Sequence, residues 1–301
     1  MKTGLVMEGG AMRGMFTCGV IDVFLEEQIR FDGAAGISAG ACFGCNFKSG
    51  QIGRAVRYNK RYCRDPRYCS LRSLLKTGDL SGADFCYREL PDVLDPFDRA
   101  AFAADPMAFF VGATDVDSGE IVYHRCLDGG ERDMLWIRAS ASMPMVSRVV
   151  EADGRRLLDG GIVDPVPWHV MEKEGYDRNV LILTQPRGYR KRKSAALPLM
   201  RLALRGMPKM AEAMSVRHEV YNRQMEEIDE KERAGEIFVL RPPESLGISR
   251  TEHDPAELER VYQLGRAEAK KALAPLRAFL TAPERQFEHA LSGGEKQGET
   301  T

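Results

Sequence analysis

Short apolar runs alternate with helical patterns through the first two thirds of the chain. Each run is mainly apolar, as expected for strands buried in a sheet. Such strands are predicted at residues 5–7, 33–37, 179–184 and 237–240. Helices are predicted at residues 13–27, 39–47, 134–141, 198–233 and 255–279. The alternation predicts a three-layer α/β/α fold around a central, mainly parallel sheet.

Two kinds of segment depart from this alternation. Pairs of short runs joined by a glycine-containing turn are predicted as hairpins, at residues 107–114 with 120–124 and at residues 149–151 with 156–158. Residues 54–88 are rich in Arg, Tyr and Cys and lack clear periodicity. We expect them to form an insertion packed over one edge of the sheet.

The length and composition are those of an ordinary globular protein. We expect one domain over residues 1–280, with a motif core at about 5–172 and a C-terminal helical and strand extension over 173–280. A short helix and a disordered tail are expected over 281–301. The 43 basic and 44 acidic residues give a formal net charge of −1, so no global field attracts nucleic acid. The oligomeric state stays open.

No apolar run approaches the ~20 residues that span a bilayer, and the N-terminal stretch lacks the apolar core of a signal peptide. We therefore expect a cytoplasmic protein with, at most, peripheral contact to the inner membrane surface. The cysteines have no regular spacing and are expected to be reduced. They are Cys18, Cys42, Cys45, Cys63, Cys69, Cys86 and Cys126.

The segment Gly36-Ile37-Ser38-Ala39-Gly40 matches the G-x-S-x-G nucleophile elbow between a predicted strand and a predicted helix. A serine at such a tight turn takes strained backbone angles, and small residues two positions away let the chain close. Its hydroxyl then stands near the positive end of the following helix. Alternatively, Ser38 merely caps that helix in a glycine-rich turn.

A first glycine-rich turn, Gly9-Gly10-Ala11-Met12-Arg13-Gly14, offers backbone N–H groups for an oxyanion. Gly9, Gly10 and Ala11 would be the donors. The rival interpretation is a dinucleotide site, because Glu26 and Glu27 follow at the distance of a ribose-binding acid. Ala11 in place of the middle glycine and the bulk of Arg13 count against it.

The five histidines form no recognisable triad motif, and Asp159-Gly160-Gly161 offers a candidate general base. An aspartate at a strand end, followed by two glycines, can reach a neighbouring turn. A lone Asp-Gly-Gly is also an ordinary turn. No His/Cys/Asp cluster has metal-ligand spacing, and Cys42 and Cys45 are expected to pack in the core.

Taken in their order along the chain, these three motifs resemble the patatin-like phospholipase family over at least residues 5–167. The stretch after Gln185 resembles a bacterial subgroup of that family. The resemblance implies a Ser38–Asp159 dyad without histidine, metal or cofactor. It implies an oxyanion loop made by Gly9, Gly10, Ala11 and Arg13. It also implies that the small-residue segment 139–144, which ends at Pro144, shapes the site. Supporting glycines are Gly14, Gly36, Gly40, Gly160 and Gly161.

The resemblance implies a serine hydrolase that cleaves acyl esters of lipids through an acyl-serine, of phospholipase A, lysophospholipase or acyl esterase type. Turnover should be modest, because aspartate is a weaker base than imidazole. The alternative is a non-catalytic acyl- or nucleotide-binding regulator on the same fold. The 54–88 insertion and the helices after Pro198 are expected to line the acyl pocket.

One basic stretch is a candidate membrane contact, and the alternative is a solvated loop that leads into a core helix. It comprises Arg187, Arg190, Lys191, Arg192 and Lys193. Further along, Arg217 and the charged residues 226–233 are expected on a solvent-exposed face.

Overall fold

The computed structural model describes residues 1–282. The strands are β1 (Thr3–Met7), β2 (Gly33–Gly36), β3 (Ala108–Asp115), β4 (Ile121–Cys126), β5 (Val150–Ala152), β6 (Arg155–Asp159), β7 (Arg178–Ile182) and β8 (Ile237–Leu240). The helices are α1 (Met15–Glu26), α2 (Ala39–Lys48), α3 (Arg54–Tyr62), α4 (Leu71–Thr77), α5 (Arg99–Ala104), α6 (Glu131–Ser140), α7 (Trp168–Lys173), α8 (Leu197–Ala203), α9 (Pro208–Ala234) and α10 (Pro255–Thr281). Two 3₁₀ helices (Ala11–Gly14, Gly160–Ile162) and a π-helix (Phe85–Leu94) complete the described elements.

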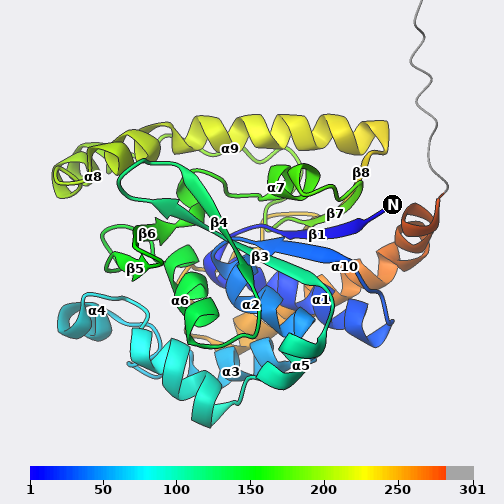
Figure 1. The fold of residues 1–301 in the computed structure, drawn as a ribbon, viewed down its shortest axis with the longest axis horizontal. Coiled ribbons are helices and arrows are strands. Elements are labelled where there is room, and N and C mark those ends of the chain that lie inside the picture. Colours follow the sequence, from blue (N-terminus) through cyan, green and yellow to red (C-terminus); the bar gives the residue numbers. More distant parts are fainter. Residues whose placement is uncertain (283–301) are drawn as a thin grey trace, which may run out of the picture.

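The eight strands form one mixed sheet, as predicted. Its parallel part runs β3-β2-β1-β7-β8, and β4, β6 and β5 add antiparallel pairs beside β3. Helices α1, α2 and α10 cover one face, and α7 and α9 cover the other (Figure 1). Successive β1 residues therefore point into different cores: Leu5 and Met7 pack with α1 and α2, and Val6 packs with α7.

The register of β3 brings two strand ends together. One edge of β3 pairs with β4 along residues 109–114. The other edge pairs first with β2, up to Gly36 opposite Val111, and then with β6, from Asp159 opposite Ala113. Since β2 runs parallel and β6 antiparallel to β3, their carboxyl ends meet beside Gly112.

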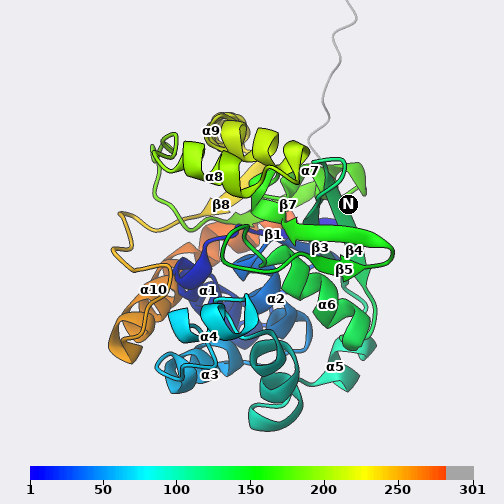
Figure 2. The same cartoon turned by 90° about the vertical axis from the view of Figure 1, so that its left-hand side faces the viewer.

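Residues 54–88, which show no clear periodicity in the sequence, are largely helical and form α3, α4 and the start of the π-helix. The prediction that they pack over a sheet edge was wrong. They pack against the helical layer, because α3 contacts α1, α2 and α10 and the π-helix contacts α6. Figure 2 shows α3, α4 and α5 on the side of the sheet opposite α8 and α9.

Helix boundaries moved by a few residues elsewhere. The helix predicted at 134–141 begins at Glu131, and the helical region predicted at 198–233 is divided into α8 and α9. No helix in residues 1–282 combines the length and apolar character that a bilayer crossing requires. The short helix and tail predicted over 281–301 lie, from residue 283 onward, outside the described residues.

Candidate active site

The turn between β2 and α2 holds Ser38 in a strained backbone conformation, with φ 54° and ψ −118°. The flanking glycines are sterically required. A Cβ on Gly36 would lie 2.5 Å from the Gly40 carbonyl oxygen, and a Cβ on Gly40 would lie 2.3 Å from that of Met7. This is the geometry that the G-x-S-x-G pattern predicts, with Ser38 immediately before the first turn of α2.

The Ser38 hydroxyl donates a hydrogen bond to Asp159, with 2.9 Å between Oγ and Oδ2. The two residues are 121 positions apart in the sequence. They meet because Ser38 follows the end of β2 and Asp159 ends β6, the two strand ends that converge beside Gly112. A Cβ on Gly160 would lie 2.4 Å from the Gly112 carbonyl oxygen, so this convergence also requires a glycine after the aspartate.

Asp159 is a buried carboxylate, with 2% of its surface exposed. Its Oδ1 accepts the Gly161 N–H at 2.7 Å. Burial raises the pKa of this carboxyl, and the positive charge of Arg217 is the largest opposing effect. A higher pKa makes the carboxylate a stronger base than an exposed aspartate.

The segment predicted to shape the site braces both members of the pair. Ser140 Oγ accepts the Ser38 N–H at 2.9 Å, and the Ser142 carbonyl accepts the Asp159 N–H at 2.8 Å. Pro144 follows in the wall of a neighbouring cavity. Residues 139–144 therefore fix the two backbone positions from which the dyad side chains project.

The glycine-rich turn after β1 lies against Ser38, and a Cβ on Gly9 would be 3.2 Å from the Ser38 Cβ. The Gly9 N–H, also predicted as an oxyanion donor, donates here to the Pro165 carbonyl at 3.2 Å. Among residues 1–282, the Gly10 and Ala11 amides have no hydrogen-bond acceptor. Ala11 has φ 50°, a left-handed conformation that glycine adopts more easily.

Arg13 and Gly14 have different parts in this turn. The Arg13 N–H closes the turn by donating to the Gly10 carbonyl, and its guanidinium Nε is buried without a partner in the described structure. Gly14 lets the turn pack on α2, since a Cβ there would lie 2.7 Å from the Phe43 ring and 2.9 Å from Ala39.

An apolar cavity of about 460 Å³ opens beside Ser38. The 54–88 insertion, predicted to line an acyl pocket, lines this cavity with Tyr58, Tyr68 and Cys86. Of the helices after Pro198, α8 contributes Met200. The π-helix adds Leu90 and other residues, as irregular helical turns often do at functional sites. The cavity is wide enough and apolar enough for an acyl chain.

A second, polar cavity of about 100 Å³ also borders Ser38. Its walls include the basic side chains of Arg13, Lys191, Arg217 and Arg250. The prediction that Arg217 lies on a solvent face was wrong, since it is part-buried and its Nε donates to the Gly161 carbonyl at 2.7 Å.

The basic stretch after β7 is divided in the structure. Arg187 pairs with Asp229 and Glu232, and Arg190 pairs with Glu226, all on α9. Lys191 points inward over the Tyr221 ring, 4.1 Å from its centre. Arg192 and Lys193 are exposed, so only these two of the five basic residues keep the unpaired, outward position expected of a membrane contact.

The acids proposed for the rival dinucleotide site lie at the far end of α1. Glu26 pairs with Arg266 and Glu27 with Arg277, both on α10. The glycine-rich turn at the other end of α1 packs instead on the Ser38 elbow. The geometry therefore favours an oxyanion loop over a nucleotide-binding turn.

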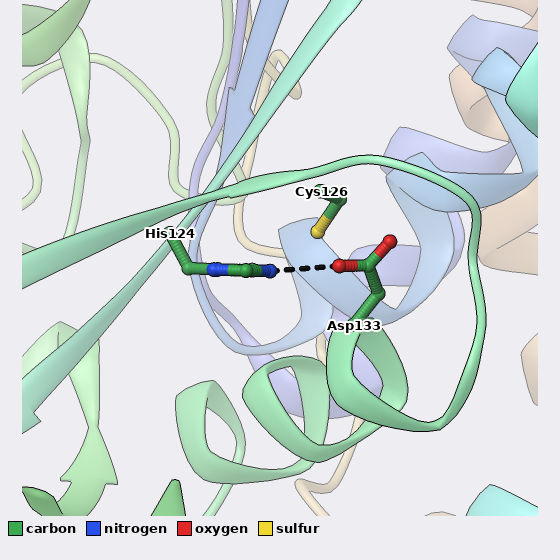
Figure 3. A group of neighbouring side chains, drawn as sticks. All are labelled: His124, Cys126 and Asp133. Carbon is green, nitrogen blue, oxygen red and sulfur yellow. Dashed lines mark hydrogen bonds and ion pairs between the residues drawn. The ribbon is translucent and has the colours of Figure 1, made fainter. Parts of the chain in front are cut away.

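A side-chain cluster that the sequence spacing did not reveal is formed by His124, Cys126 and Asp133, whose ligand atoms lie within 4.8 Å of one another (Figure 3). His124 Nε2 is 2.7 Å from Asp133 Oδ1, and Asp133 Oδ2 accepts the backbone N–H groups of residues 127–129. Burial raises the pKa of Cys126 and keeps it a thiol. Through these hydrogen bonds the cluster stabilises the turn between β4 and α6.

Comparison with known proteins identifies the family. The family model described as patatin-like phospholipase matches residues 5–171, more than half of the chain. The chain belongs to this family. A second model, described as a domain of unknown function (DUF6363), matches residues 207–281. The patatin-like part thus contains Ser38 and Asp159, and the second region contains Arg217 and Arg250.

Similar proteins carry few functional names. The uncharacterized protein YjjU of Escherichia coli is 28% identical over 93% of this chain and 79% of its own length. An uncharacterized NTE family protein of Mycobacterium tuberculosis is 29% identical over 55% of this chain, which spans 44% of that relative. The crystal structure of VipD from Legionella pneumophila aligns with 14% identity and a TM-score of 0.44, covering 91% of this chain and 67% of VipD.

Proposed function

We propose that this patatin-like protein hydrolyses acyl esters of lipids through a Ser38–Asp159 dyad. The observation that carries the proposal is the 2.9 Å hydrogen bond from Ser38 Oγ to a buried carboxylate whose pKa is raised. The apolar cavity beside Ser38 supports a lipid acyl chain as the group transferred. Membership of the family supports lipid hydrolysis as the reaction class.

In the proposed mechanism Asp159 accepts the Ser38 proton while Oγ attacks the ester carbonyl. The carbonyl oxygen becomes an oxyanion, for which the unpaired amides of Gly10 and Ala11 are the available donors. The tetrahedral intermediate collapses to an acyl-serine, and Asp159 passes its proton to the leaving alcohol. Asp159 then takes a proton from water, which attacks the acyl-serine. The fatty acid leaves as Asp159 returns that proton to Ser38 Oγ.

The direct test uses a fluorophosphonate probe and a series of p-nitrophenyl esters on the wild type, Ser38→Ala and Asp159→Asn. Wild type should be labelled on Ser38 and should hydrolyse the esters, and both variants should lose turnover while remaining folded. Ser118→Ala, which changes an exposed serine in the β3–β4 turn, is the matched control. A folded wild type with neither label nor turnover would refute the proposal and favour the acyl-binding alternative.

A further inference from the structure

The two cavities beside Ser38 differ in character and share part of their walls. Ala11, Ser38, Met143, Asp159 and Arg250 line both. An ester with its carbonyl at Ser38 can therefore place its acyl chain in the apolar cavity and its alcohol part in the polar one. The polar cavity, of about 100 Å³, has room for a small group.

The basic groups of the polar cavity have no ionic partners. Within residues 1–282, no carboxylate lies within ion-pair distance of Arg13, Lys191, Arg217 or Arg250. By contrast, an arginine of the loop that carries Lys191 does form an ion pair: Arg187 pairs with Glu232. Arg13, Lys191 and Arg217 are part-buried and Arg250 is exposed. Unpaired cations gathered around one cavity repel each other, and an anion would relieve that repulsion.

The acids in the same cavity are already engaged. Glu8 is buried, and its carboxylate accepts hydrogen bonds from the Thr184 N–H and the Tyr221 hydroxyl. Asp159 accepts from Ser38 and Gly161. The donors of Lys191, Arg217 and Arg250 therefore remain for a ligand.

We propose that this cationic pocket binds a phosphate group on the alcohol part of the ester, so that the preferred substrates are acyl esters of glycerol phosphate. The inference rests on the proposed hydrolase function and adds a headgroup class to it. Phosphate suits the pocket because it presents several acceptor oxygens to an ammonium group and to guanidinium forks that approach from different elements.

The residues that build the pocket lie mainly beyond the patatin-like part of the chain. Lys191 comes from the loop after β7, Arg217 from α9, and Arg250 from the loop before α10. Arg217 and Arg250 fall within the matched domain of unknown function. The proposal therefore gives that domain a part in substrate selection.

The test compares kcat/KM for 1-acylglycerol 3-phosphate with kcat/KM for a monoacylglycerol carrying the same acyl chain. The wild type should prefer the phosphate ester. Lys191→Gln and Arg250→Gln should each reduce that preference about tenfold to a hundredfold, the range for a lost hydrogen bond to a charged group. Arg192→Gln, an exposed neighbour, is the matched control and should keep the wild-type ratio.

A second measurement is calorimetric titration with inorganic phosphate at constant ionic strength, which does not require turnover. Together with the kinetics it distinguishes a site for a lipid headgroup phosphate from a site for free phosphate. Ester hydrolysis without preference for the phosphate ester would overturn the headgroup assignment and leave the hydrolase proposal standing. Phosphate binding that depends on Lys191, in a protein without esterase activity, would show a free-anion site and also overturn it. Absence of phosphate binding, together with equal turnover of both esters, would refute the pocket itself.

Discussion

Lys191 provides a quantitative test of the polar cavity, because it is part-buried and its ammonium group has no ionic partner in residues 1–282. Burial, followed by the charge of Arg217, lowers its pKa from 10.5 to about 7, although Glu8 acts in the opposite direction. The charged groups that face it are Glu8, Arg13, Arg217 and Arg250. In the unfolded chain the same lysine is protonated up to its ordinary pKa.

The change of stability with pH follows from the difference in protons bound by the folded and unfolded states. Between pH 7 and 10.5 the unfolded state binds more protons at this site than the folded state, so stability rises with pH through this window. At pH 8 the folded protein holds Lys191 mostly neutral, which costs about 3 kcal/mol relative to a side chain that never carries charge. Lys191→Met keeps the aliphatic stem over Tyr221 and removes this cost.

The expected result is that Lys191→Met is more stable than the wild type by roughly 2–3 kcal/mol at pH 8, and that the difference shrinks towards pH 10. Urea unfolding at pH 7, 8, 9 and 10 measures both quantities. Lys193→Met, an exposed residue of the same loop, should leave stability unchanged within about 0.5 kcal/mol. A destabilised Lys191→Met, or parallel pH profiles for variant and wild type, would show that the ammonium group has a stabilising partner.

Three further predictions concern other buried or strained positions. Asp159→Asn should lower kcat about 10²- to 10⁴-fold without unfolding the protein, and wild-type hydrolysis should fall as pH drops through a carboxyl pKa raised above 3.8; kinetics against pH measure both. Burial raises the pKa of Asp22 from 3.8 to about 6, so its contribution to stability is present below pH 4 and lost by pH 6. Between pH 4 and 6 the stability of Asp22→Asn relative to the wild type should therefore rise by up to roughly 3 kcal/mol, as measured by urea unfolding. The same change of stability with pH in both proteins would contradict this. Ala11 has a positive φ. The free energy of unfolding of Ala11→Gly should lie within about 1 kcal/mol of the wild-type value, and Ala11→Val should lose more than that.

The parts of the site that the sequence predicted are those fixed by local sterics. Gly36 and Gly40 are needed within a few residues of Ser38, and the turn from Gly9 is closed by its own backbone. Such requirements leave a short, readable pattern. The pairing of Ser38 with Asp159 depends instead on strand register, and only the resemblance to a family could predict it from sequence.

The misplacement of Arg217 has a different cause. Its charge suggested a solvent face, yet it lies on the buried stripe of α9 with Met210, Met214, Tyr221, Gln224 and Ile228. These positions recur at intervals of four and three, the spacing of a core-facing stripe. An arginine at a core-facing position of a helix is predicted to point inwards, whereas its residue type alone predicts a solvent-exposed position.

The burial of Lys191 follows from the way its loop meets α9. Arg187 and Arg190 reach acids in the second half of the helix, and the backbone of Lys191 is held by two hydrogen bonds with Asn222. These contacts turn the Lys191 side chain towards Tyr221 and the polar cavity. Two well-paired arginines thus hold an unpaired lysine where it lowers the stability of the free protein. A bound phosphate would raise the Lys191 pKa again and offset this cost.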